Sequence, residues 1–374
     1  YEQKINENLD SESLNKILDD CHLIANKYPK NSKLFYLIGS IMWSKLELEK
    51  AIHYFKETLK IDPQNLKAKN KLNEAKKEKL NLITYLTYTN LEKKSSNSII
   101  RAHQRLQKID NNITFKQFIS DEFVINLYQK MENVIISEEI DTDLAVTQIH
   151  RESKNTKFKF YDCKRHFEVF NTFNVIPENC FGCYKISILP RNILEMIKLY
   201  LLFDKLNQLI PLTRKCMVEL RPGINDPYKA YIYCVGIDEA EKTLQQLNQV
   251  LDTTISNSIP RSIKRGCSEF SQSYPDFKIA DKEKIDFMNY NPDWRIKEKI
   301  IDDKLLRNKG KKITSVETVH GFSLKDFVVI SNWLFYAKKI GDQSYNLLCK
   351  QPSHSEYLNK KINYEFVNNL QFKT

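Results

Sequence analysis

Glycine is scarce in this chain, with only 8 among 374 residues. Neither glycine-rich phosphate-binding pattern, G-x-G-x-x-G or G-x-x-x-x-G-K-[ST], occurs, so the common nucleotide-binding enzymes are disfavoured. No apolar run approaches the roughly 20 residues that a membrane-spanning helix needs. The longest run, FVVISNWLFYA at 327–337, is interrupted by Ser331 and Asn332. The sequence therefore predicts a globular protein with no membrane partner.

Cysteine is also sparse, at 8 positions, which is too few for a disulfide-dense scaffold of this length. Several cysteines cluster at short spacings, which favours metal binding in a reducing compartment. No signal peptide is recognisable. We therefore expect a cytoplasmic location.

Positive charge is in excess, with a formal net charge of +11. Two stretches carry much of it: residues 66–94 hold eight Lys against three Glu, and residues 299–312 hold six Lys or Arg against two Asp. Such a balance favours acidic partners, either nucleic acid or an acidic protein. Lysine enrichment from AT-rich coding explains it equally well, so both interpretations stay open.

The segment 31–64, NSKLFYLIGSIMWSKLELEKAIHYFKETLKIDPQ, carries four residue types at fixed spacings. Gly39 is a small residue in a first helix, Ala51 and Phe55 form an A-x₃-F in a second helix, and Pro63 closes the unit. This pattern resembles the 34-residue tetratricopeptide repeat (TPR). The resemblance covers about residues 1–90, with a degenerate copy before this segment and, after it, an amphipathic helix with a Lys-rich outer face that resembles a solvating cap.

The TPR resemblance implies a concave surface that binds a protein or peptide. An array this short can instead be only a packing or dimerisation element. The resemblance places the partner-facing positions on the first helices of the repeats, at Lys33, Tyr36, Ser40, Trp43, Lys67 and Asn70.

A helical connector is expected over residues 91–150. Within it, SDEFVINLYQKM begins with Ser120 as an N-cap, followed by acidic residues in the first turn.

A candidate metal site lies in YDCKRHFEVFNTFNVIPENCFGCYK. Cys163 and His166 form a C-x₂-H pair, and Cys180 and Cys183 form a C-x₂-C pair thirteen residues further on. Two short-spaced pairs of thiolate or imidazole ligands suit tetrahedral Zn²⁺. Because four protein ligands leave no open position, we expect a structural zinc in a zinc-ribbon-like element at 151–185. A strand and turn are expected between the pairs, and iron stays open as the alternative metal.

The same segment partly resembles the zinc deaminases, through the H-x-E at His166 and Glu168 followed by C-x₂-C. Only eleven residues separate Glu168 from Cys180, too few for the strands that this family places there. The structural zinc is therefore preferred.

From residue 183 to 270 the hydrophobic pattern alternates between strand and helix periods. The order β-α-β-β-α-β predicts a ferredoxin-like domain with a four-stranded antiparallel sheet and both helices on one face. The expected strands are 183–190, 213–222, 228–236 and 262–270, and the expected helices are 191–208 and 238–251.

Alternation also predicts which side chains line the face without helices. KAYIYCV at 229–235 partly resembles the RNA-recognition-motif consensus, and two tyrosines on an open sheet can stack on bases. The face can equally pack on another domain. The candidate nucleic-acid-binding residues are Lys215, Arg221, Lys229, Tyr231 and Tyr233.

Cys267 is the weak catalytic candidate, because Lys264 and Arg265 beside it would lower the pKa of its thiol. Residues 271–312 are aromatic, polar and basic and are expected to form a surface docking arm. Residues 322–342 are expected to be a helix that Gly341 ends.

The sequence thus predicts a multidomain α+β protein: TPR helical hairpins at 1–90, a connector at 91–150, the zinc element, the ferredoxin-like domain, and a helical extension at 271–374. The leading functional prediction is a non-catalytic adaptor that binds a protein and also RNA or single-stranded DNA. The alternative is an enzyme with its site between the zinc element and the sheet, using Cys267, Glu219, Arg221 or His150.

Overall fold

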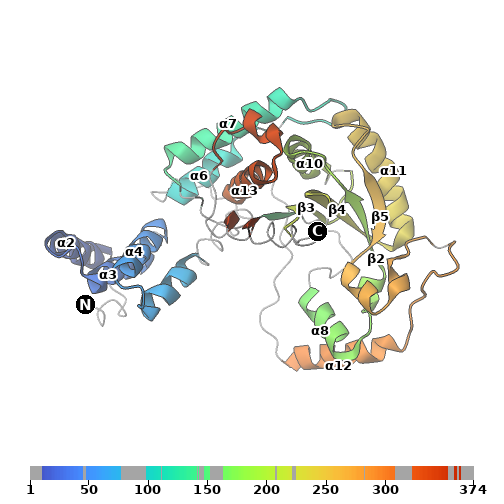
Figure 1. Cartoon of the computed structure of the whole chain (residues 1–374), viewed down its shortest axis with the longest axis horizontal. Coiled ribbons are helices and arrows are strands. Elements are labelled where there is room, and N and C mark those ends of the chain that lie inside the picture. Colours follow the sequence, from blue (N-terminus) through green and yellow to red (C-terminus); the bar gives the residue numbers. More distant parts are fainter. Residues whose placement is uncertain are drawn as a thin grey trace. The chain divides into compact units, whose positions relative to one another are not determined.

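The chain folds into helices and one antiparallel sheet, which confirms the predicted α+β class. It divides into two units, one comprising residues 1–104, 136–141 and 323–325 and the other the remainder. Figure 1 shows the helices and strands with their labels. The structure is a computed structural model, and it describes residues 11–44, 48–76, 98–110, 112–140, 142, 147–151, 163–206, 209–220, 225–281, 283–307, 322–352, 358–359 and 362–363.

The first unit begins with consecutive helices that bury one shared apolar core. The helices are α2 (Ser11–Lys27), α3 (Ser32–Ser44), α4 (Leu48–Ile61) and a further helical stretch at 66–76. Phe55 of α4 is fully buried in this core, and Cys21, 34 residues earlier, is 3% exposed. Gly39 is required at the α3–α4 crossing, because a Cβ there would lie 2.8 Å from two ring carbons of Phe55.

The turns that lead into α3 and into the 66–76 helix are built alike. In residues 28–31, the N–H of Asn31 donates to the carbonyl of Tyr28 (3.1 Å), and the Asn31 side chain caps the N–H of Leu34 (3.3 Å). In residues 62–65, the N–H of Asn65 donates to the carbonyl of Asp62 (3.2 Å). The side chain of Asn65 caps the N–H of Ala68 (3.0 Å). The same turn and cap therefore recur after 34 residues.

The connector contains the helices α6 (Ser98–Gln107) and α7 (Asp121–Ser137). The predicted N-cap is confirmed, since the Ser120 hydroxyl oxygen accepts from the N–H of Phe123 at 3.1 Å. The connector is not wholly helical, because it ends in the short strand β1 (Gln148–Arg151).

The second unit is centred on a five-stranded sheet with the order β1-β3-β4-β2-β5, in which every neighbouring pair is antiparallel. The predicted order of two helices and four strands over 183–270 is present, and β1 adds an unexpected fifth strand beside β3. The elements are β2 (Cys183–Ile188), α10 (Ile193–Lys205), β3 (Arg214–Val218), β4 (Tyr228–Val235), α11 (Gly236–Thr254) and β5 (Arg261–Arg265).

Two contacts place α10 and α11 against the same face of the sheet. Thr243 of α11 hydrogen-bonds the Cys234 thiol, and Asp342 accepts from both the Tyr228 hydroxyl (2.6 Å) and the first N–H of α10, at Ile193 (2.7 Å). Tyr228 and Cys234 share one face of β4, because successive side chains alternate along a strand. Burial follows the same alternation: Tyr228, Ala230, Ile232 and Cys234 are fully buried, whereas Tyr231 and Tyr233 are half-buried.

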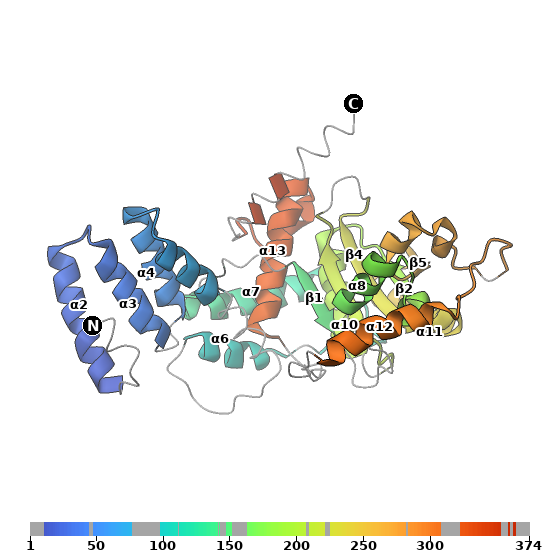
Figure 2. The same ribbon diagram turned by 90° about the horizontal axis from the view of Figure 1, so that it is seen from below.

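A separate aromatic cluster lies beyond one end of the sheet. It is formed by α8 (Cys163–Phe173), α9 (Glu178–Phe181), the 3₁₀ turns η2 (Ser268–Gln272) and η3 (Pro275–Lys278), and α12 (Trp294–Arg307). Helices α8 and α12 run side by side (Figure 2).

This cluster corrects two predictions. The stretch after the C-x₂-H pair belongs to the helix α8 rather than to a strand and turn, since its apolar Val169 and Phe173, four residues apart, both pack in the cluster. The aromatic residues of the expected docking arm are part of the core: Phe277 is fully buried and Trp294 is 9% exposed.

The predicted C-terminal helix is confirmed as α13 (Leu324–Ile340). Gly341 follows it with a φ of +84°, the left-handed conformation that ends helices, and the N–H of Asp342 donates to the carbonyl of Ala337 at 3.0 Å. Trp333 of α13 packs edge-on against Tyr200 of α10. Across the described part of the chain, no helix combines the length and the apolar composition required to traverse a bilayer.

Candidate functional site

The predicted metal ligands lie on two neighbouring structural elements at the aromatic cluster. Cys163 is the first residue of α8, and His166 follows three residues later in the same helix. Cys180 is the third residue of α9, and Cys183 begins β2 after Gly182, whose N–H donates to the carbonyl of Glu178 at 2.9 Å. His166, Cys180 and Cys183 are buried, with 4%, 6% and 6% exposure.

The donor types of these residues suit Zn²⁺, but the described atoms do not position a complete ligand set. The side chain of Cys163 lies outside the described residues. Among the side chains that are described, no group of three or more His, Cys, Asp or Glu converges as a metal site. The metal therefore stays a prediction.

A buried ion-pair network fixes α8 against α12. The guanidinium of Arg165 donates to Glu298 (2.7 Å) and to both carboxylate oxygens of Asp302 (2.8 Å each). Glu298 also accepts from the N–H of Glu178 at the start of α9. Burial by itself would lower the pKa of Arg165, which is 9% exposed, but its hydrogen bonds to Asp302 and Glu298 and their negative charges raise the pKa overall. The network orients the helix that carries His166.

Cys267 follows β5 and is half-buried against the aromatic cluster. One of the two cations expected to activate its thiol, Arg265, is engaged elsewhere. The guanidinium carbon of Arg265 lies 4.7–5.3 Å from the ring centroids of Phe181, Tyr184, Phe277 and Phe287.

Arg265 also donates to three backbone carbonyls, the shortest bond being to Phe181 at 2.8 Å, with Ile279 at 3.2 Å and Met288 at 3.4 Å. Burial lowers the pKa of this guanidinium. Cation–π contacts and carbonyl acceptors together compensate a buried arginine. Arg265 thus ties the loop that follows η3 to the sheet.

The predicted partner-facing residues of the repeat lie on α3 and on the 66–76 helix. Lys33, Lys67 and Asn70 are exposed, whereas Tyr36, Ser40 and Trp43 are half-buried. The rings of Tyr36 and Trp43 rest on the buried ring of Phe55, at centroid distances of 5.8 and 6.2 Å.

Lys71 joins these two helices and was missed by the sequence analysis. Its Nζ lies 4.2 Å from the centroid of Trp43, and it pairs with Glu74 at 3.0 Å. The contact brings the aromatic stripe of α3 beside the lysines of the 66–76 helix. Sequence spacing gives no signal for Lys71, because its position depends on how the two helices pack.

The predicted nucleic-acid-binding residues are only partly brought together. Tyr231 and Tyr233 share one face of β4 with ring centroids 6.3 Å apart, and Lys215 of β3 is paired with Tyr231. Lys229 is buried and its ammonium pairs with Glu219 at 3.0 Å, so a phosphate would have to displace that carboxylate. Arg221 lies outside the described residues.

Lys185 of β2 belongs to the same face and was also missed. It is paired with Tyr233 in the sheet, and its Nζ lies 5.0 Å from the ring centroid of Tyr231. Burial lowers the pKa of the Lys185 ammonium. The strand order β4-β2, which the sequence does not specify, is what brings Lys185 to the tyrosines.

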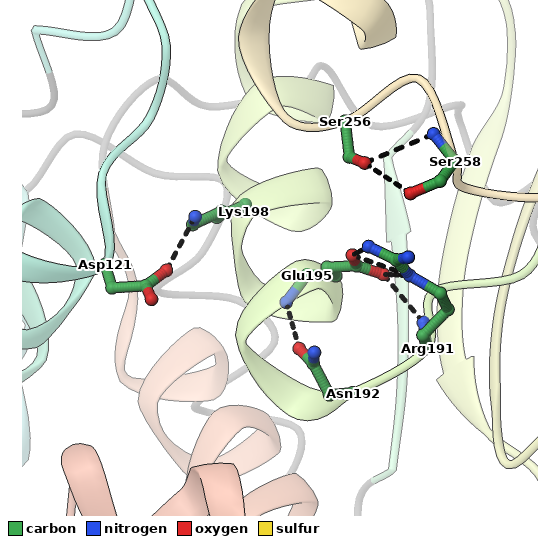
Figure 3. Close-up of polar contacts among 7 residues, drawn as sticks. All are labelled: Asp121, Arg191, Asn192, Glu195, Lys198, Ser256 and Ser258. Carbon is green, nitrogen blue, oxygen red and sulfur yellow. Dashed lines mark hydrogen bonds and ion pairs between the residues drawn. The ribbon is translucent and has the colours of Figure 1, made fainter.

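Polar side chains also surround the first turns of α10, although α10 is buried from Ile193 to Asp204 (Figure 3). The side chain of Asn192 caps the N–H of Glu195 (2.9 Å), and Glu195 forms an ion pair with Arg191. Lys198 pairs with Asp121 at 2.7 Å. Because these charges compensate one another, the group anchors a buried helix.

The chain matches none of the protein families, curated proteins or solved structures with which it was compared.

Proposed function

We propose that the N-terminal helices form a TPR-like array that binds a protein partner, and that the chain is an adaptor. The observation that carries this proposal is the recurrence, after 34 residues, of the same capped turn at 28–31 and 62–65. A repeat at this period stacks helical hairpins and leaves their first helices along one surface.

The composition of that surface supports a protein ligand. Tyr36 and Trp43 are held by packing on Phe55, so they can contact a partner with little loss of side-chain entropy. Lys33 is exposed on α3, the helix that carries both rings, and Lys67 is exposed on the neighbouring 66–76 helix. Aromatic anchors surrounded by polar groups are typical of the residues that dominate binding energy at protein interfaces.

The test starts from peptides selected from a displayed random library against the whole chain. The affinity of the selected peptides is then measured by fluorescence anisotropy. Trp43→Ala should weaken binding about 10-fold or more, the loss expected of an aromatic anchor. Lys67→Glu should weaken binding to acidic peptides, whereas Lys60→Glu, at an exposed position on α4, should not. The proposal would be refuted if the selected peptides bound all three variants as tightly as they bind the unmodified chain.

We further propose that β2–β5 with α10 and α11 form a ferredoxin-like domain. The strand order β3-β4-β2-β5, with every neighbouring pair antiparallel and both helices on one face, supports this assignment.

A structural Zn²⁺ held by Cys163, His166, Cys180 and Cys183 is proposed beside this domain. The ion would fasten α8 to the start of β2 through two short-spaced ligand pairs. Burial of His166 and of both C-x₂-C cysteines supports it, and thiolate ligands suit a reducing location such as the cytoplasm.

Metal analysis of the purified chain tests this assignment. About one zinc per chain is expected, and Cys180→Ser or Cys183→Ser should remove it. Cys216→Ser is the matched control, because Cys216 is a buried cysteine in the middle of β3. Iron in place of zinc would change the metal but keep the ligands, and a metal-free wild-type chain would refute the site.

The enzymatic alternative based on Cys267 has less support. Lys264 remains exposed next to Cys267, but Arg265 is enclosed by aromatic rings. We therefore propose the non-catalytic role.

A further inference from the structure

The face of the sheet turned away from α10 and α11 combines tyrosine and lysine side chains. Tyr231 and Tyr233 lie two residues apart on β4 and project from this face. In the ladder, Lys215 of β3 is paired with Tyr231, and Lys185 of β2 is paired with Tyr233. Each tyrosine therefore has a lysine on an adjacent strand, at the distance of about 5 Å between Cβ atoms that directly paired positions have.

The basic character continues to the edge strand. Lys264 of β5 is exposed and is paired with Lys185 across the β2–β5 ladder. The strand positions of this face whose side chains are described, in β2 to β5, include no Asp or Glu. Glu219, directly after β3, is neutralised by Lys229. The described strand positions of this face therefore carry an excess of positive charge, in keeping with the net charge of +11.

The two rings are arranged as separate surfaces rather than as a stacked pair. Their centroids are 6.3 Å apart and their planes are tilted by 48°. Both residues are half-buried, so packing holds each ring in place while part of it stays exposed. Flat rings fixed beside cations match the two repeating parts of a nucleic-acid strand, the base and the phosphate.

We propose that this face binds single-stranded nucleic acid, with bases stacked on Tyr231 and Tyr233 and phosphates held by Lys185, Lys215 and Lys264. A single strand is required, because bases paired within a duplex do not present their ring faces to a protein. RNA and DNA share this chemistry, and the experiment compares them. The proposal is independent of the repeat-mediated adaptor function.

The test measures fluorescence anisotropy of labelled oligo(U) and oligo(dT), each about 12 nucleotides long, with the full chain at about 50 and 200 mM salt. Binding at low salt that weakens steeply with added salt is expected, because each lysine–phosphate contact releases counterions. Tighter binding of one oligonucleotide would identify RNA or DNA as the ligand. Absence of binding to both at low salt would overturn the proposal.

Variants separate this face from adhesion through charge alone. Tyr231→Leu and Tyr233→Leu should each raise Kd about 5- to 100-fold with an unchanged salt slope, because stacking is lost and phosphate contacts are kept. Tyr233→Phe keeps the ring and should bind nearly as wild type. Normal thermal unfolding of each variant verifies that the sheet is intact.

Lys264→Ala changes an exposed edge residue and should reduce the salt slope by about 0.7, the contribution of one phosphate contact on a single strand. Lys242→Ala is its matched control, because Lys242 is exposed on α11, which covers the other face. Equal effects of the two lysine variants would overturn the proposal. The proposal would also be overturned if Tyr231→Leu and Tyr233→Leu each changed Kd by less than about twofold.

Discussion

Replacing Gly39 with alanine tests the packing of α3 on α4. The added Cβ would lie 2.8 Å from Cδ1 and Cε1 of Phe55 and 3.3 Å from Cζ. Carbon atoms in favourable contact are about 3.5–4.0 Å apart. The ring or the helix would therefore have to shift by about 0.7 Å or more.

Two effects of this change oppose each other. Alanine is about 1 kcal/mol more favourable than glycine inside a helix. Overpacking a well-filled core costs about 1–3 kcal/mol. Phe55 is fully buried and its ring contacts those of Tyr36 and Trp43, so it has little room to move. The steric cost should exceed the gain in helix propensity, so the α3–α4 hairpin should be destabilised by about 1 kcal/mol.

Amide hydrogen exchange in the intact chain measures this locally. A loss of about 1 kcal/mol corresponds to roughly fivefold less protection for the amides of α3 and α4. Ser40→Ala, one residue further along α3, is the control: it adds no atoms and should leave protection equal or higher. Its hydroxyl donates to the carbonyl of Tyr36 at 2.9 Å, a bond within the same helix.

A double mutant identifies the cause. Phe55→Leu shortens the side chain that the added methyl group at position 39 would meet, so the combined loss should be about 1–3 kcal/mol smaller than the sum of the single losses. If Gly39→Ala instead raised protection about fivefold, helix propensity alone would be acting. The close approach of α3 and α4 would then be wrong.

Three further perturbations test the second unit. Glu298→Gln should lower the free energy of unfolding by about 3 kcal/mol, because it removes a buried charged partner of Arg165. Asp302→Asn should lower it by less, because the Asp302 side chain is 46% exposed, and thermal unfolding of both variants measures the difference. Asp342→Ala removes the acceptor shared by the Tyr228 hydroxyl and the α10 N-terminus. Losing both hydrogen bonds should lower the free energy of local opening by about 1.4 kcal/mol or more, so amide exchange at the start of α10 should accelerate by at least tenfold. Burial, with a smaller contribution from a nearby carboxylate, raises the pKa of Cys234 from 9.0 to about 12. The unfolded thiol therefore loses its proton first, so stability should fall as pH rises from 9 towards 12, and Cys234→Val should lessen that fall in urea titrations at several pH values.

Local periodicity predicted most elements of the second unit, because backbone conformation and side-chain alternation depend on near neighbours in sequence. Strand β4 was expected at 228–236 and spans Tyr228–Val235, and α10 was expected at 191–208 and spans Ile193–Lys205. Strand β1 was missed because four residues are too few to show a period. Helix α8 was misassigned because FEVFNTF fits both periods.

The sites were predictable only where the residue pattern itself carried the information. The alternation that turns Tyr231 and Tyr233 to one face follows from the sequence, as does the 34-residue period of the N-terminal repeat. Lys185 was missed because its neighbour Tyr231 belongs to a strand more than 40 residues away in the chain. Lys229 was expected to meet phosphate and instead pairs with Glu219, which directly follows the adjoining strand β3.

Apart from β1 and α8, the sequence by itself determined which of the described segments of the second unit are helical or extended, which side of each is apolar, and the excess of positive charge. Only the tertiary structure decided what those surfaces meet. The aromatic residues at 277–294 were predicted to lie on an exposed arm. In the structure they pack against one another, and Phe277 and Phe287 contact Arg265. The reason is that burial depends on contacts between distant segments, whereas helix and strand formation depends on neighbours a few residues apart.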